Sequence, residues 1–145
     1  ITDNQGTGTI TNDDGAVLPT LSIDNVALTE GNAGTANAVF TVTLSAASAS
    51  TVTVTAQTAN NTAASPGDYT ATGPTVLTFN PGDLTKTFSV PVVGDLLDEV
   101  NETYFVNLTS PTNATIASSA WRARSTACSS TLRVPVWARC GATRI

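Results

Sequence analysis

The sequence contains no histidine and no methionine, and it has only two cysteines in 145 residues. Without histidine there is no Ser-His-Asp or Cys-His arrangement, no imidazole ligand for zinc and no ordinary general base at neutral pH. A pair of carboxylates could still act as in a glycosidase, but the best candidates share one loop, and few aromatic residues are present to line a cleft. We therefore expect a protein that is not an enzyme.

Basic residues are nearly absent from most of the chain. Lys86 is the only one in 1–120, and it stands against all eleven acids, so this range has a net charge of −10. Nucleic acid and anionic membranes are bound through Lys and Arg, so neither is expected as a partner. No apolar run approaches the roughly 20 residues of a membrane-spanning helix, so we expect no membrane insertion. The natural partners of such a chain are cations.

The last 25 residues have a different composition. Residues 121–145 hold five Arg and no acid, together with both Trp residues and both cysteines, Cys128 and Cys140. An out-of-frame reading of GC-rich coding sequence gives such a composition, and a genuine extension is the alternative. We interpret 121–145 as a foreign or disordered tail. Because the chain starts at Ile1 and shows no signal-peptide pattern, we expect an internal fragment of a longer protein.

Short segments with period-two alternation of apolar and polar residues fill the chain between Leu21 and Ile116. Clusters of Gly, Pro, Asn and Asp separate these segments, and no helical period is present, so we predict an all-β sandwich of two sheets. The first segment breaks phase near Asp24-Asn25, where a bulge or a switch between sheets would restore the pattern. The predicted strands lie at about 20–30, 38–45, 51–58, 69–79, 85–93 and 103–109.

A sandwich of this kind normally has a seventh strand, and the sequence shows no clear candidate after Ile116. Residues 1–14 have the pattern of such a strand, with a Gly/Thr segment and an acidic cluster, and we interpret them as the end of a preceding repeat. A linker at 15–20 then leads into a domain at 21–120 whose last strand is missing or replaced. We expect residues 5–11 to pair with the open strand edge of a neighbouring molecule.

Several motifs occur in an order that is more specific than any one of them. They are Leu21-Ser22-Ile23, Glu30-Gly31-Asn32, Phe40-Thr41-Val42-Thr43-Leu44-Ser45, Gly67-Asp68-Tyr69, Leu77-Thr78-Phe79-Asn80-Pro81-Gly82, Val92-Val93-Gly94-Asp95, Asn101-Glu102-Thr103-Tyr104 and Asn12-Asp13-Asp14. In this order, over about 1–116, they resemble the Calx-beta family. The resemblance implies an immunoglobulin-like antiparallel sandwich, found in the calcium sensors of sodium/calcium exchangers and in tandem in bacterial surface and secreted proteins. An extracellular or cell-surface location follows as an expectation.

Calcium ligands are expected at one end of this sandwich. In an up-and-down alternation, the connections after the first, third and fifth strands fall at one pole, where calcium would find the oxygen ligands that it needs. The resemblance matches Glu30, Asp95 and Glu99 to ligand positions, and it places an amide, Asn60, at a position that is usually acidic. The predicted calcium ligands are therefore Glu30, Asn60, Asp95, Asp98 and Glu99.

Each of these groups also has a simpler interpretation. Glu30 can be a solvated residue of a glycine turn, and 95–99 can be an acidic loop that aids solubility. We interpret Asp68 as the cap of a turn and Tyr69 as a ring at the sandwich edge. Two functions remain: a calcium-binding repeat that stiffens an adhesive extracellular array, in contact with neighbouring repeats, and a structural spacer without metal. A host or cell-surface protein, or a glycan, stays open as a further partner.

Overall fold

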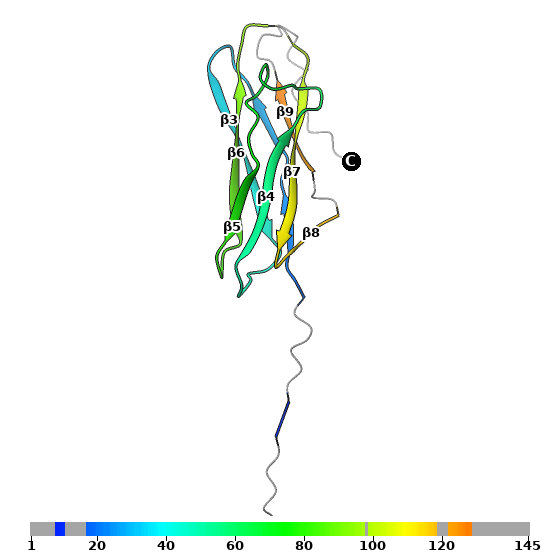
Figure 1. The fold of residues 1–145 in the computed structure, drawn as a ribbon. Coiled ribbons are helices and arrows are strands. Elements are labelled where there is room, and N and C mark those ends of the chain that lie inside the picture. The colour runs from blue at the N-terminus through cyan, green and yellow to red at the C-terminus, as the bar shows by residue number, and fades with distance from the viewer. Residues whose placement is uncertain (1–7, 11–16, 98, 119–121, 129–145) are drawn as a thin grey trace, which may run out of the picture.

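The computed structural model describes residues 8–10, 17–97, 99–118 and 122–128, which form an elongated sandwich of two β-sheets (Figure 1). One sheet has the order β6-β3-β1-β8 and the other the order β2-β9-β7-β4-β5. In this part of the chain no helix is long and apolar enough to cross a membrane. The strands are β1 (Thr20–Ile23), β2 (Val26–Thr29), β3 (Thr35–Leu44), β4 (Val52–Ala59), β5 (Thr75–Phe79), β6 (Thr85–Val93), β7 (Glu102–Thr112), β8 (Thr115–Ile116) and β9 (Arg122–Cys128).

The core lies between the two sheets and follows the period-two pattern of the sequence. On β3 the side chains of Phe40, Val42 and Leu44 are buried, whereas the threonines between them are only partly buried. The same alternation on β4, β6 and β7 supplies the facing apolar side chains. The all-β sandwich is therefore confirmed, because each long strand has one dry face.

The break in the first predicted strand is a switch between sheets. β1 pairs with β3 in one sheet, and β2 pairs with β9 in the other. Asp24 lies at the switch, where its Oδ1 accepts a hydrogen bond of 2.7 Å from the backbone N–H of Thr41. The Asp24 side chain therefore supplies an acceptor for the Thr41 N–H just beyond Ile23, where the pairing of β1 with β3 ends.

The fourth predicted strand is shorter than expected. Only Thr75–Phe79 forms a strand, and the residues before it form a loop in which Tyr69 makes one isolated bridge with Val92. Pro74 has no N–H to donate to a ladder, which accounts for the late start of the strand. Tyr69 lies beside the edge strand β6, in agreement with the prediction that it packs at the sandwich edge, but its side chain is buried there. Its ring is 1% exposed and stacks on Tyr104 at a centroid distance of 4.3 Å.

The last strand of the sandwich is β9, and this corrects two expectations. Residues 122–128 lie between β7, with which they pair antiparallel, and β2, with which they pair parallel. The prediction that this part of 121–145 does not pack on the sandwich is wrong, and 129–145 lie outside the described residues. Because β7 pairs with β4 on one side and β9 on the other, the open edge expected for strand donation is filled.

The segment expected to donate a strand is mostly outside the described residues. Within it, 8–10 are exposed and not in a strand. Its assignment to a preceding repeat, and the boundaries at 14 and 20, stay predictions. β1 begins at Thr20, whose N–H bonds to Ser45, so the chain enters the sandwich at the pole that carries the β3–β4 and β5–β6 connections.

Candidate metal site

Three connections meet at the opposite pole: 30–34 after β2, 60–74 between β4 and β5, and 94–101 between β6 and β7 (Figure 1). The first and third are in close backbone contact. The N–H of Gly94 donates to the carbonyl of Gly34 at 2.9 Å, and a Cβ at position 94 would lie only 2.6 Å from the carbonyl oxygen of Glu30. Glycine is needed at position 94 because a side chain would separate these two connections.

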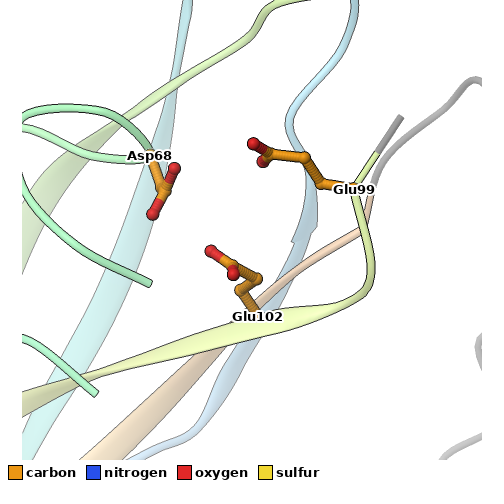
Figure 2. A group of neighbouring side chains, drawn as sticks. All are labelled: Asp68, Glu99 and Glu102. Carbon is orange, nitrogen blue, oxygen red and sulfur yellow. The ribbon is translucent and has the colours of Figure 1, made fainter. Parts of the chain in front are cut away.

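Two carboxylates from these connections and one from the first residue of β7 converge. Asp68, Glu99 and Glu102 each offer one oxygen, and these three oxygens lie within 4.8 Å of one another. Figure 2 shows the three carboxyl groups directed into a common space, with Asp68 on one side and Glu99 and Glu102 on the other. All three side chains are partly buried. Carboxylates at such separations repel one another unless a proton or a cation lies between them.

Backbone hydrogen bonds hold Asp68 in this position. Its Oδ2 accepts a hydrogen bond of 2.6 Å from the N–H of Ala64, and its carbonyl accepts one from the N–H of Val93. Glu102 is the first residue of β7, so the strand ladder fixes its backbone. Two of the three carboxylates are therefore placed by the sandwich itself, and Glu99 comes from the loop between β6 and β7.

The acidity of these groups reflects their crowding. The pKa of Glu99 is raised from its ordinary value by partial burial and by the negative charges of Asp68 and Asp95. The pKa of Glu102 is raised by burial, then by a hydrogen bond to Asp68 and by repulsion from the neighbouring carboxylates. Both shifts favour the neutral form, so each of these two carboxylates is harder to ionise in the folded protein than it would be alone in water.

Glu30 belongs to the same charged pole. It is 8% exposed, which is unusual for a carboxylate, and burial raises its pKa first, followed by the charges of Glu99, Asp95 and Asp68. Asp95 lies at the start of the loop, where its Oδ1 accepts a hydrogen bond of 2.7 Å from the N–H of Leu97. Among the described residues, the pole thus gathers five acids, with Asp68, Glu99 and Glu102 at the closest approach.

The predicted ligands have different outcomes. Glu30, Asp95 and Glu99 lie close enough to influence one another, and their role as ligands stays a prediction. Asp98 lies outside the described residues. The Oδ1 of Asn60 accepts hydrogen bonds from the N–H of Ser65 at 3.1 Å and from the hydroxyl of Tyr69 at 2.5 Å. The structure therefore gives Asn60 a part in fixing its loop rather than a place among the clustered carboxylates.

Sequence reasoning missed Asp68 and Glu102. Asp68 does cap a turn as expected, but it also joins the cluster, since one side chain can accept from Ala64 and still lie beside other carboxylates. The parity of the connections places both residues at this pole, because Asp68 lies in the connection after β4 and Glu102 directly follows the connection after β6. Strand parity places whole loops and does not rank the acids within them.

The donor set selects for one class of ion. Every group in the cluster is a carboxylate, and hard oxygen donors suit calcium and magnesium, whereas zinc and copper sites use imidazole or thiolate. Three carboxylates supply three to six oxygens, depending on how many bind through both atoms, against the six to eight that calcium takes.

Comparisons with known proteins agree with this fold. A model of the Calx-beta domain family matches residues 13–129, a range that includes β9. Solved structures of similar fold include the apo-form Calx CBD1 domain, with a TM-score of 0.65, 18% identity and coverage of 76% of this chain and 97% of that one. No curated protein matches the sequence.

Two further solved structures are also similar in fold and low in sequence identity. The calcium binding domain CBD12 of CALX1.1 has a TM-score of 0.66 and 18% identity, with 75% of this chain and 45% of that chain covered. The Calx CBD2 domain has a TM-score of 0.66 and 15% identity, with 77% and 87% covered. Identities this low indicate a shared fold, and the chemistry of the pole must be argued from its own residues.

Proposed function

Because this chain belongs to the Calx-beta domain family, we propose that it is a non-catalytic module that binds calcium at its acidic pole. The observation that carries the proposal is the approach of the Asp68, Glu99 and Glu102 carboxylate oxygens to within 4.8 Å of one another. A divalent cation between them would convert repulsion into attraction. The name of one similar solved structure, the calcium binding domain CBD12 of CALX1.1, supports the choice of calcium.

The module would act within a longer extracellular protein, most simply as one repeat of an adhesive or stiffening array. The chain enters the sandwich at Thr20, at one pole, and β9 ends at Cys128 at the other (Figure 1). Entry and exit at opposite ends suit a row of repeats joined head to tail. A calcium ion that ties together the connections after β4 and β6 would stiffen the pole that faces the next repeat.

Calorimetric titration with calcium tests this function. We would compare the parent chain with a Glu99→Gln/Glu102→Gln variant, which keeps side-chain shape and removes two charges. Asp68 is left unchanged because its carboxylate also holds the N–H of Ala64. The matched control is Asp83→Asn, which removes a carboxylate at the opposite pole, where Asp83 pairs with Lys86 at 2.8 Å.

We expect the parent and the control to bind calcium, and the double variant to lose most of its affinity. At a calcium concentration about 100 times the dissociation constant, the gain in stability should be roughly 2.7 kcal/mol. Magnesium should bind less well, because it demands a rigid octahedral shell and retains its water. If the parent shows neither binding heat nor a change in melting temperature, the alternative of a structural spacer without metal is correct.

A further inference from the structure

Most of the large apolar side chains that the described residues expose lie at the two ends of the sandwich. At the acidic pole, the loop between β6 and β7 directs three of them to solvent, with Leu96 75% exposed, Leu97 62% and Val100 80%. Three exposed aliphatic side chains within five residues are unfavourable in water unless something covers them. We call this surface the apolar tip.

The pole at which the chain enters the sandwich carries a second apolar surface. Val17, Leu18 and Leu84 are exposed there, the last two by 48% and 49%. The N–H groups of Leu44 and Ser45, at the end of β3, donate to the carbonyls of Leu84 and of the first residue of β1. The segments that carry these three side chains are therefore held at the same end of β3. We call this surface the apolar base.

The two poles differ in charge. The acidic pole gathers the five acids named above, with no basic residue among the described residues of its three connections. Among the described residues of the entry pole, Asp83 is the only acid, and it pairs with Lys86 at 2.8 Å. Tip against tip would bring two sets of five carboxylates together, whereas tip against base brings one set to a surface without net charge. The base is therefore the better match for the tip.

We infer that the apolar tip of one copy of this chain packs on the apolar base of a second copy. The two surfaces lie at opposite ends of an elongated sandwich, so one molecule cannot cover its own tip (Figure 1). A pair of molecules joined in this way still has one free tip and one free base. The contact is therefore of the head-to-tail kind, which repeats along a row.

The contact is weak between separate molecules. A few aliphatic side chains on each surface bury less than the roughly 1,200 Å² of stable complexes. In a protein with several such repeats, a short linker holds neighbours at a millimolar effective concentration, so a dissociation constant of about 0.1 mM would keep the contact mostly closed. The inferred contact would then fix the angle between neighbouring repeats.

Calcium should strengthen this contact. Asp95 and Glu99 flank the exposed leucines on the same loop, so packing against the tip removes water from these carboxylates as well. A cation at the acidic pole would neutralise part of their charge and lower that cost. This effect of calcium rests on the proposed function, whereas the contact between tip and base does not.

Light scattering of the full chain, at concentrations up to the millimolar range, tests the contact. The average mass of the parent should rise with concentration in saturating calcium, and less so in chelator. A tip variant, Leu96→Ser/Leu97→Ser, and a base variant, Leu18→Ser/Leu84→Ser, should each remain monomeric, because each lacks one of the two surfaces.

Mixing the two variants gives the decisive measurement. The tip variant keeps an intact base and the base variant keeps an intact tip, so an equimolar mixture should reach the mass of two chains and no more. Such restored pairing would also show that both variants are folded. The control is Val39→Thr/Val76→Thr, which removes two exposed aliphatic side chains from strands β3 and β5 and should associate as the parent does.

A monomeric parent, or a mixture that remains monomeric, would overturn the inference. Self-association of the tip variant alone would indicate a contact between two bases, and self-association of the base variant alone a contact between two tips; either result would overturn it as well. Calorimetry separates the two proposals. Calcium binding by a parent that remains monomeric would refute the contact and leave the proposed function intact. Pairing of the mixed variants without any heat of calcium binding would uphold the contact and refute the calcium function.

Discussion

Replacing Ser125 by aspartate tests whether β9 is an integral strand of the sandwich. Ser125 is completely buried, and it pairs with Tyr104 on β7 and with Val26 on β2. Burial raises the pKa of the Tyr104 phenol, and the nearby Ser125 hydroxyl opposes this rise. Their contact does not reach hydrogen-bond geometry, because neither hydroxyl has a hydrogen-bond partner among the described residues. Position 125 is therefore a dry site, where the unpaired Tyr104 hydroxyl could offer a new carboxylate only one hydrogen bond.

The magnitudes follow from this environment. A buried, unpaired carboxylate costs several kcal/mol, which is a large part of the roughly 5–15 kcal/mol by which domains are stable. Ser125→Asp should therefore unfold the sandwich or expel β9. Ser125→Ala removes an unsatisfied hydroxyl and should stabilise the fold by about 1 kcal/mol, or roughly 4 °C in melting temperature. The two variants should shift stability in opposite directions.

Thermal and denaturant unfolding, followed by near-ultraviolet circular dichroism, measure both effects. Ser89→Asp is the control, since Ser89 lies on β6 and is exposed, and we expect it to stay within about 0.5 kcal/mol of the parent. If Ser125→Asp melts as the parent does, residues 122–128 do not pack on the sandwich in solution. The earlier expectation of an unpacked tail would then be correct.

Three further predictions concern the acidic pole. In chelator, the free energy of unfolding should fall as the pH rises from about 4.5, the ordinary glutamate value. The reason is that the raised pKa values of Glu30, Glu99 and Glu102 mean that the folded state holds protons more tightly than the unfolded state. Denaturant titrations across pH check this, and saturating calcium should abolish the fall. Gly94→Ala places a Cβ 2.6 Å from the Glu30 carbonyl oxygen and should cost about 1–3 kcal/mol while weakening calcium binding in calorimetry. Asn60→Ala removes the acceptor of the Tyr69 hydroxyl and should cost about 1 kcal/mol on unfolding, without changing calcium affinity. A large loss of calcium affinity in that variant would instead make Asn60 a ligand, as the family resemblance implies.

The strands that could be predicted are those in which apolar and polar residues alternate, because this alternation marks the buried face of the strand. In β3, Phe40, Val42 and Leu44 mark the inner face so clearly that the expected and observed strands differ mainly in where they start. The phase break at Asp24-Asn25 was equally informative, because a residue cannot change faces within one regular strand. Local sequence is sufficient in such cases, since strand periodicity is a property of the local backbone.

β9 could not be predicted in the same way. Its sequence, RARSTAC, contains none of the large aliphatic residues that mark β3 and β6. What makes it a strand is the pair of edges that β7 and β2 present, and β2 lies far away in the sequence. Pairing between distant segments overrides the weak preferences of a short segment.

The sequence by itself determined the fold class, the acidic character of the body and, through strand parity, the pole at which the acidic loops gather. Only the tertiary structure decided which acids meet, because Asp68 is placed by its own hydrogen bond to Ala64 and by the bond between its carbonyl and Val93. The approach of the Asp68, Glu99 and Glu102 carboxylate oxygens to within 4.8 Å of one another depends on the separations between these loops. Such separations are set by backbone contacts between distant segments, such as that of Gly94 with Glu30, which no local pattern encodes.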